Sequence, residues 1–383
     1  MQAISEGFLR HFEEVDDPRI DNANRRHELS DMLILTILAV ICGADSWTEI
    51  EAFGQAKLDY LKPLLKLPHG IPSHDTLGEV FARLCPDELQ AGFLSWINAL
   101  VTVSAGEVVA IDGKTLRHSY DRGGNRGAIH MVSAWATTNH VVLGQRKVDD
   151  KSNEITAIPQ LLKTLQLADT IVTIDAMGCQ KGIAAQIIQG QADYVLSLKG
   201  NQGQLHEDVK QYLDQAIDQA RSDWGGERHE TIDKGHGRVE VRRYWITEAI
   251  DWLEDKARWC GLRSIGAVES ERHIGGQVSV EWRYFIASIE ADAKVFARAV
   301  RSHWGIENQL HWSLDVTFRE DDCRVRQGHA AQNLALVRHL ALNLLKNEQS
   351  AKVGIKIKRS KAGWDHRYLA KVLAVGQTSS EVT

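Results

Sequence analysis

The chain has 383 residues, of which 43% are hydrophobic and 25% are charged, and its net charge is −6. This is the composition of an ordinary globular protein, and it excludes a disordered chain, a collagen-like repeat and a disulfide scaffold. A net negative charge also argues against a protein whose whole surface grips nucleic acid, because phosphate binding needs local positive charge.

The charge is unevenly distributed along the chain. Residues 1–105 carry 8 basic and 16 acidic side chains, whereas residues 319–383 carry 12 basic and 6 acidic ones. The front of the chain is therefore at −8 and the end is at +6, so the overall balance hides a basic tail. The net charge consequently does not exclude a nucleic-acid partner, and phosphate contacts are expected from the end of the chain.

The sequence predicts a cytoplasmic protein without membrane contact. The longest apolar run, 32–42, is shorter than the ~20 residues that a membrane-spanning helix needs, and it is typical of a buried core helix. The N-terminal residues are acidic and amphipathic and do not have the pattern of a signal peptide. The five cysteines are scattered without a CxxC pair, as expected of reduced thiols in a cytosol.

The first hundred residues predict helices. Residues 29–41 form a broad apolar helix that is expected to begin near Ser30 or Asp31 as a cap and to stop at Gly43. Shorter helices are expected to follow it, separated by a loop rich in proline and glycine. We assign residues 1–105 to a small helical N-terminal domain.

The pattern changes after this domain to β-branched runs alternating with helices. A run at 108–111 predicts a buried strand followed by a turn at Asp112, and a second run at 170–174 ends at Asp175. A hairpin and two helices are expected around these strands, and Asn153 and Glu154 are expected to cap the first of these helices. The alternation over residues 106–223 predicts an α/β layer with a partly parallel sheet, the first part of a core domain.

Residues 224–290 break this alternation. Their polar and apolar residues alternate with period two, which predicts a β-rich insertion. Residues 293–314 are then predicted to form one helix, because their apolar residues recur at helical spacing. We assign residues 291–345 to the second part of the core and residues 346–383 to a basic C-terminal tail.

Two carboxylates lie at the ends of the predicted buried strands. Asp112 and Asp175 each begin a glycine-containing turn at the carboxyl end of a strand, where α/β sheets bind ligands. Two neighbouring carboxylates repel unless a cation lies between them, and oxygen ligands of this kind suit Mg²⁺ or Mn²⁺. An aspartate after a strand can equally be an ordinary turn residue, and this alternative stays open.

A third acidic residue lies on the predicted helix 293–314. His303, Glu307 and His311 recur every four residues on one helical face, among apolar neighbours such as Trp304. A carboxylate on a core-facing helix is costly unless it has a partner. A solvated helix surface and a His–Glu–His zinc site are the alternatives, although the spacing matches no usual zinc motif.

Basic side chains form several short groups with interleaved tryptophan and tyrosine, which suits phosphate contact and base stacking. Any one group can instead be a solvated face. The candidates near the strands and the glutamate helix are Lys199, Arg238, Arg242, Arg324 and Arg326. The tail adds Lys352, Lys356, Lys358, Arg359 and Lys361, together with Trp364 and Tyr368.

Seven sequence segments occur in an order that marks one family. They are GIPSHDTLGEVF (70–81), VVAIDGKTLRHS (108–119), IVTIDAMGCQ (171–180), YVLSLKGNQ (194–202), KGHGRVEVR (234–242), HWGIENQLHWSLDVTFREDDCRVR (303–326) and IKIKRSKAGWDHRYLAKVL (355–373). With these segments, which span nearly the whole chain, the sequence resembles the DDE transposases of the H-repeat-associated insertion-sequence family.

The resemblance implies a retroviral-integrase-like, RNase-H-like catalytic core with the β-rich block inserted before the glutamate helix. By motif, Asp112, Asp175 and Glu307 match the family's two aspartates and glutamate, which in similar proteins hold two Mg²⁺ (or Mn²⁺) ions. One ion would deprotonate an attacking water or 3′-hydroxyl, and the other would stabilise the leaving oxygen. The implied partners are double-stranded DNA and, on that DNA, further copies of the chain, with no membrane and no organic cofactor.

Other residues around the family's glutamate are not matched. Related families have a tyrosine, an arginine and a lysine at minus seven, minus four and plus seven, and this chain has Val300, His303 and Leu314 there. We expect other side chains to contact phosphates in their place, namely Arg301, His303 and His311. Lys114, two residues after Asp112, is a further candidate for DNA contact.

The sequence therefore predicts an insertion-sequence transposase of the bacterial cytoplasm, associated with the nucleoid. It would bind the terminal inverted repeats of its element, cleave DNA at the element ends and transfer 3′-hydroxyl strands to target DNA. Two alternatives stay open: a metal-dependent nuclease without strand transfer, and a non-catalytic DNA-binding remnant of a mobile element. The acidic N-terminal domain is expected to contact protein, or to bind DNA through local residues such as Arg25 and Arg26.

Overall fold

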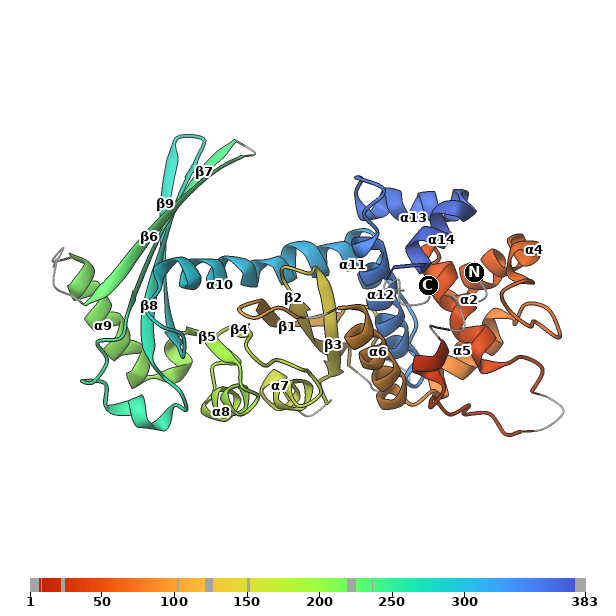
Figure 1. Ribbon diagram of the computed structural model, residues 1–383, viewed down its shortest axis with the longest axis horizontal. Helices are drawn as coiled ribbons and strands as arrows, with labels where there is room; N and C mark the ends of the chain where they lie inside the picture. The colour runs from red at the N-terminus through yellow and green to blue at the C-terminus, as the bar shows by residue number, and fades with distance from the viewer. Residues whose placement is uncertain are drawn as a thin grey trace, which may run out of the picture.

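One mixed sheet of nine strands runs through the part of the chain that the structure describes. The computed structural model describes residues 7, 9–21, 25–101, 103–120, 127–149, 152–218, 225–235 and 237–375. Figure 1 shows helices on both faces of this sheet, an arm of long strands at one end of the molecule and a helical region at the other. The predicted boundary at 223/224 and the last residues of the tail, 376–383, lie outside the described residues.

The strand order of the sheet is β3-β2-β1-β4-β5-β9-β8-β7-β6. Strands β1 and β4 pair in parallel, as do β4 and β5, whereas β2, β3 and β6–β9 pair antiparallel with their neighbours. This arrangement confirms the predicted α/β class with a partly parallel sheet. The strands are β1 Val108–Leu116, β2 Ile129–Ala136, β3 Val141–Lys147, β4 Ile171–Ile174, β5 Asp193–Leu198, β6 Gly226–Gly235, β7 Arg238–Thr247, β8 Ser264–Ile274 and β9 Gln277–Ala287.

Asp112 lies inside β1, so the prediction that the strand ends there in a turn is wrong. Strand β2 pairs with β1 along its whole length and places Ser133 opposite Asp112. The ladder with β2 therefore satisfies backbone groups beyond the apolar run, which the apolar pattern of β1 alone does not reveal. Strand β4 does end before Asp175, as predicted.

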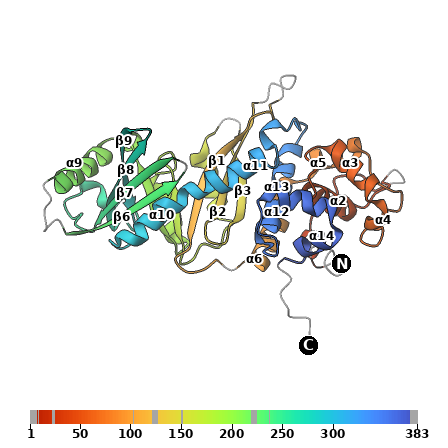
Figure 2. The same ribbon diagram turned by 90° about the horizontal axis from the view of Figure 1, so that it is seen from above.

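The helices α7 (Glu154–Leu162) and α8 (Lys181–Gln189) lie on one face of the sheet, and α10 (Ala293–Gly305) lies on the other. Figure 2 shows α10 crossing over β1 and β2. The side chain of Asn153 caps α7 by accepting a hydrogen bond from the backbone of Ile155, as its position before the helix predicts. A helix that the sequence reading missed, α9 (Gln204–Asp218), precedes the arm of β6–β9.

The predicted single helix 293–314 is wrong in one respect. The chain is helical from α10 through α11 (Trp312–Val316), but a π-helical segment, Ile306–His311, separates the two α-helices. In a π-helix the backbone bonds span five residues rather than four, so side chains spaced by four no longer share one face. Short helical turns also occur at Arg10–Phe12, Gly200–Gln202, Glu254–Arg258 and Glu320–Asp322.

The N-terminal region is helical, as predicted. Its longer helices are α2 Leu29–Ile41, α3 Trp47–Ala56, α4 Leu58–Leu61, α5 His74–Arg83 and α6 Pro86–Leu100. Helix α2 is buried on nearly all sides, as expected of a helix that is apolar all round. Neither Ser30 nor Asp31 caps it, because the helix begins after Glu28 without a side-chain cap. Asp31 instead accepts hydrogen bonds from the backbone of Lys66 and Leu67.

The C-terminal region packs onto these N-terminal helices. Helices α12 (Ala330–Asn347) and α13 (Ile355–Trp364) contact α2, and α14 (His366–Leu373) contacts α12. Both views show the two regions at the same end of the molecule (Figures 1 and 2). None of the helices formed by the described residues is both long and apolar enough to cross a membrane.

Two of the basic residues of the tail are structural. Lys358 and Arg359 are 6% and 4% exposed. The guanidinium of Arg359 donates hydrogen bonds to the carbonyl of Val40 at 2.9 and 3.1 Å, and it pairs with Asp45 at 2.9 Å. The interpretation of the whole tail as an exposed phosphate-binding group is therefore wrong for these two residues. Arg359 satisfies carbonyls at the end of α2, and Lys358 donates to the carbonyl of Leu345 in α12 at 2.9 Å.

Candidate active site

Asp112 and Asp175 lie on neighbouring parallel strands. The last paired residues of β1 and β4 are Ile111 and Ile174, so the two aspartates are the next residue on each strand. Asp175 Oδ1 accepts hydrogen bonds from the backbone of Met177 at 3.0 Å and Gly178 at 3.3 Å. This bonding shows that Asp175 organises the turn after β4, as the alternative of an ordinary turn residue predicted, and its role as a metal ligand stays a prediction.

Asp112 lies at the centre of an acidic group. Its side chain is 20% exposed. Burial, together with the nearby carboxylates of Glu154, Asp175 and Glu307, raises the pKa of Asp112 to about 7. The fold therefore brings Asp175 and Glu307 within range of the charge of Asp112, although the three residues come from segments far apart in the chain.

Glu154 is a fourth carboxylate that the sequence reading treated only as part of a helix cap. It lies in the first turn of α7 and accepts a hydrogen bond from Nε2 of His130, with the two atoms 2.6 Å apart. Its carboxylate and the His130 ring occupy the space where a side chain at residue 113 would begin, and this close approach requires Gly113. In the sequence, the glycine after Asp112 was the signal for this contact with Glu154, but it was interpreted as a turn residue.

The π-helical segment places Glu307 and two histidines differently from a regular helix. Glu307 is exposed, whereas His311 Nδ1 lies 3.5 Å from Asp112 Oδ2 and His303 Nδ1 lies 3.0 Å from Thr173 Oγ1. Burial lowers the pKa of both histidines to about 4, so both imidazoles are neutral at pH 7. Segments of π-helix inside α-helices occur frequently at functional sites.

The donor set fits a hard divalent cation. Among the described residues, no group of three or more His, Cys, Asp or Glu side chains is already arranged to hold a metal ion, and this applies to Asp112, Asp175 and Glu307 as much as to the His–Glu–His alternative. The two sets therefore differ in the chemistry of their donor atoms. Asp112, Asp175 and Glu307 offer oxygen donors, which Mg²⁺ and Mn²⁺ prefer. A cation among them would relieve the repulsion that helps to raise the pKa of Asp112.

Two of the predicted DNA-contacting cations are engaged inside the protein. Lys114 is 11% exposed, and its ammonium lies 2.6 Å from Asp315 and 2.8 Å from Glu320. Arg242, on β7, is 11% exposed at its side chain and pairs with Asp233 at 2.5 Å and with Glu240. A contact of either residue with DNA stays a prediction, and each cation already has carboxylate partners.

The other predicted cations reach the surface. Lys199, Arg301 and Arg324 are exposed, and the side chain of Arg238 is 52% exposed beside Glu240. Arg326 is half-buried, donates a hydrogen bond to the carbonyl of His118 at 3.0 Å and lies over the ring of Tyr120. In the N-terminal region, Arg25 pairs with Asp17 and Asp21 at 3.3 and 3.7 Å.

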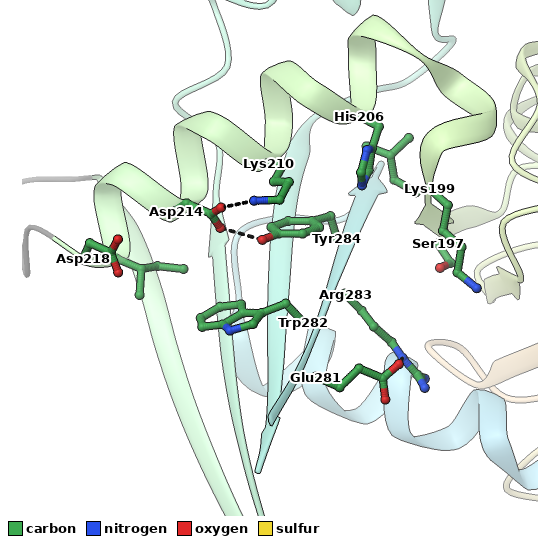
Figure 3. Close-up of a pocket in the computed structure, with 12 residues that line it drawn as sticks. Ser197, Lys199, His206, Lys210, Asp214, Asp218, Glu281, Trp282, Arg283 and Tyr284 are labelled. Carbon is green, nitrogen blue, oxygen red and sulfur yellow. Dashed lines mark hydrogen bonds and ion pairs between the residues drawn. The ribbon is translucent and has the colours of Figure 1, made fainter. Parts of the chain in front are cut away.

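A cavity of about 490 Å³ lies between α9 and β9 and was not foreseen. Figure 3 shows it between α9 and β9, with Lys199, Trp282 and Tyr284 on its walls. Tyr284 donates a hydrogen bond to Asp214 at 2.5 Å. The guanidinium of Arg283, which also lines the cavity, lies 4.5 Å from the ring centre of Trp304, on the helix that leads to Glu307.

Comparison with known proteins identifies the family of this chain. The family described as "Transposase DDE domain" matches residues 104–344, and one described as "DDE_Tnp_1-associated" matches residues 9–97. The chain is 43% identical over 356 residues to the "H repeat-associated putative transposase YhhI" and to the "Putative protein YbfL", both of Escherichia coli strain K12. Each alignment covers 91% of this chain and 93% of the relative.

A third relative, the "Putative transposase YncI" of Escherichia coli O157:H7, is 43% identical over 353 residues, which cover 91% of this chain and 90% of that protein. A transposase DDE domain implies an RNase-H-like fold, and the mixed sheet with helices on both faces agrees with it. Domains of this kind use divalent metal ions in general, and transposases bind DNA. The chain belongs to the family of transposases with a DDE domain, as its motifs indicated.

Proposed function

We propose that this protein is an active insertion-sequence transposase that uses Asp112, Asp175 and Glu307 to cleave and transfer DNA strands by two-metal phosphoryl transfer. It would bind the terminal inverted repeats of its element, cut at the element ends and join the freed 3′-hydroxyls to target DNA. The observation that carries the proposal is the acidic group around Asp112, which assembles from three distant segments of a chain with a transposase DDE domain. Neighbouring carboxylates repel one another, and clusters of them are found at functional sites such as those that bind a cation.

The chain's own residues have separate tasks in this reaction. When bound, the two Mg²⁺ or Mn²⁺ ions supply a deprotonated nucleophile and stabilisation of the leaving oxygen. Asp112 interacts electrostatically with both of the other carboxylates and would be one of the metal ligands. Asp175 is held by backbone N–H groups. Glu307 is exposed on its π-helical turn and would complete the ligand set from the side of α10.

We place the DNA on the side of α10. Figure 1 shows α10 running between the arm of β6–β9 and the helical end that contains α13. Arg238, Lys199, Arg301 and Arg324 are exposed and would contact phosphates. The tail adds Trp364, which is 79% exposed and would stack against the nucleic acid.

The test is a cleavage assay on DNA that carries the element's end. Asp175→Asn and Glu307→Gln are expected to abolish Mg²⁺-dependent strand cleavage while DNA binding persists, because the substitutions remove metal ligands and not phosphate contacts. Asp59→Asn is the matched control, since the side chain of Asp59 is 99% exposed and far along the chain from the site. Full cleavage by the Asp175→Asn protein would refute the assignment.

A joining assay separates this function from its alternatives. A transposase supplied with pre-cut 3′-hydroxyl ends makes recombinant product, whereas a nuclease without strand transfer only hydrolyses DNA. A non-catalytic remnant binds the DNA and does neither. One relative with 51% identity over 57 residues, 15% of this chain, is named "Inactive transposase YbfQ", which makes the remnant a concrete alternative.

Two further parts of the proposal concern assembly and place. Joining two element ends requires at least two active sites, so we propose self-association on the DNA within the bacterial cytoplasm, at the nucleoid. Light scattering on the protein with and without end DNA is expected to show that a complex with two DNA ends contains more than one chain. A single chain bound to two ends would contradict this part.

A further inference from the structure

Lys114 is a buried cation next to the acidic site. It follows Asp112 by two residues on β1, and because side chains alternate along a strand, both point to the face that α10 covers. Its ammonium lies 2.6 Å from Asp315, 2.8 Å from Glu320 and 3.4 Å from Asp321. The residue therefore has three carboxylate partners while it is only 11% exposed.

All three partners come from the segment that follows Glu307. Asp315 is in α11, the direct continuation of the π-helical segment, and Glu320 and Asp321 are in the next helical turn. Glu320 is itself 2% exposed and lies 3.6 Å from Arg338 of α12. Lys114 therefore connects β1, which carries Asp112, to the segment that directly follows the helix carrying Glu307.

Two further contacts reinforce this connection. The carbonyl of His118 accepts a hydrogen bond from Arg326 at 3.0 Å, and Arg117 pairs with Asp321 at 3.1 Å. Both join the end of β1 or the residues just after it to the segment 320–326. The side chain of Arg117 is 76% exposed, so its ion pair contributes little, and Lys114 is the buried member of the set.

We propose that Lys114 is a positioning residue that fixes the separation of Asp112 and Glu307 for metal binding and does not contact DNA. This inference rests on the proposed function, because it concerns the same metal site. It replaces the earlier expectation that Lys114 binds phosphate. The ammonium already pairs with the carboxylates of Asp315, Glu320 and Asp321, and the side chain is only 11% exposed. A phosphate would therefore have to displace one of these pairs to contact it.

Positioning and simple electrostatics have opposite effects on metal affinity. The ammonium of Lys114 is a positive charge near the site, so an electrostatic role alone predicts that its removal makes the site more negative and binds a divalent cation more tightly. A positioning role predicts weaker binding, because Asp112 and Glu307 would no longer be held at one separation. The sign of the change therefore distinguishes the two.

The experiment measures Mn²⁺ binding by the loss of the free-ion electron paramagnetic resonance signal. We expect Lys114→Met to raise the Mn²⁺ dissociation constant by about tenfold, which corresponds to ~1.4 kcal/mol, and Lys114→Arg to restore most of the affinity. Lys358→Met is the matched control. Lys358 is also buried, and it donates to the carbonyl of Leu345 at 2.9 Å from α13. Both Met variants lower the unfolding temperature, but only Lys114→Met changes Mn²⁺ affinity.

A milder variant covers the case in which Lys114→Met does not fold. The side chain of Asp315 is 32% exposed, so Asp315→Asn loosens the connection while Lys114 keeps Glu320. It is expected to raise the Mn²⁺ dissociation constant by about threefold, ~0.65 kcal/mol. Unchanged or tighter Mn²⁺ binding in these variants overturns the positioning role.

DNA binding gives the second readout. The salt dependence of DNA affinity is expected to be the same for wild type and Lys114→Met. A slope reduced by about one would show that Lys114 neutralises a phosphate, and it would overturn the inference while leaving the proposed function intact. Absence of Mn²⁺ binding by the wild-type protein would instead refute the proposed metal site itself, and the positioning role with it.

Discussion

Replacement of Asp112 by asparagine is expected to stabilise the metal-free protein at neutral and alkaline pH. The substitution keeps the size of the side chain and removes its charge. In the native state the pKa of Asp112 is raised from 3.8 to about 7 by burial and by the carboxylates of Glu154, Asp175 and Glu307. The ionised form is therefore the unfavourable form in the folded protein.

The magnitude follows from proton linkage. Between about pH 4 and pH 7 the folded state holds a proton on Asp112 that the unfolded state has released, so stability falls as pH rises through this window and is then constant. A shift of about three pKa units at 1.36 kcal/mol each sets an upper bound of roughly 4 kcal/mol. Only 20% of the side chain is exposed, so solvent screens this effect weakly.

Urea unfolding with a metal chelator present, at pH 5 and pH 8, measures the effect. The stability of wild type relative to Asp112→Asn is expected to fall between these values, so that Asp112→Asn is the more stable protein at pH 8. Added Mg²⁺ at pH 8 should stabilise wild type and not the variant. Asp59→Asn, at an exposed position, is the control and should follow wild type. An unchanged difference in stability between wild type and Asp112→Asn at the two pH values would refute the electrostatic account of the site.

Three other substitutions test separate parts of the structure. Gly113→Ala is expected to lower the free energy of unfolding in urea by about 1–3 kcal/mol, because the new methyl group displaces the Glu154 carboxylate. In a Glu154→Ala background the same substitution should cost much less, and equal costs in both backgrounds would contradict the close contact. Arg359→Met breaks a buried pair with Asp45 and should destabilise the protein by about 3–5 kcal/mol, so an unchanged unfolding midpoint would refute its structural role. Trp364→Ala should leave the unfolding midpoint unchanged while it weakens DNA binding in a gel-shift titration, and unaltered binding would remove this side chain from the interface.

The strands and helices of the core were predictable because their signals are local. The apolar run 170–174 ends at Asp175 in the sequence and in the structure, and Asn153 caps α7 as its position suggested. The extent of β1 was not predictable from its own residues, because the pairing with β2 continues the strand through Asp112. A strand's end depends on its partner as well as on its apolar pattern.

The composition of the site was only partly predictable. The contact between Glu154 and Gly113 depends on how α7 docks on the sheet, which no spacing in the sequence reveals. The π-helical segment at Glu307 keeps the same residues in helical structure but changes which of them share a face. Charge counts likewise do not distinguish Lys114, buried among carboxylates, from Arg301, which is exposed.

The contact between Arg359 and the end of α2 has a consequence for synthesis of the chain. Helix α2 is complete once residue 41 has been made, but the guanidinium that binds the carbonyls of Val40 and Ala44 arrives more than 300 residues later. At about 5–20 residues per second, this apolar helix waits on the order of tens of seconds on the ribosome before its C-terminal cover exists. The N-terminal region is therefore synthesised first, but its contacts with Arg359 form only after the end of the chain has been made. During that interval, groups other than Arg359 must protect α2 from aggregation.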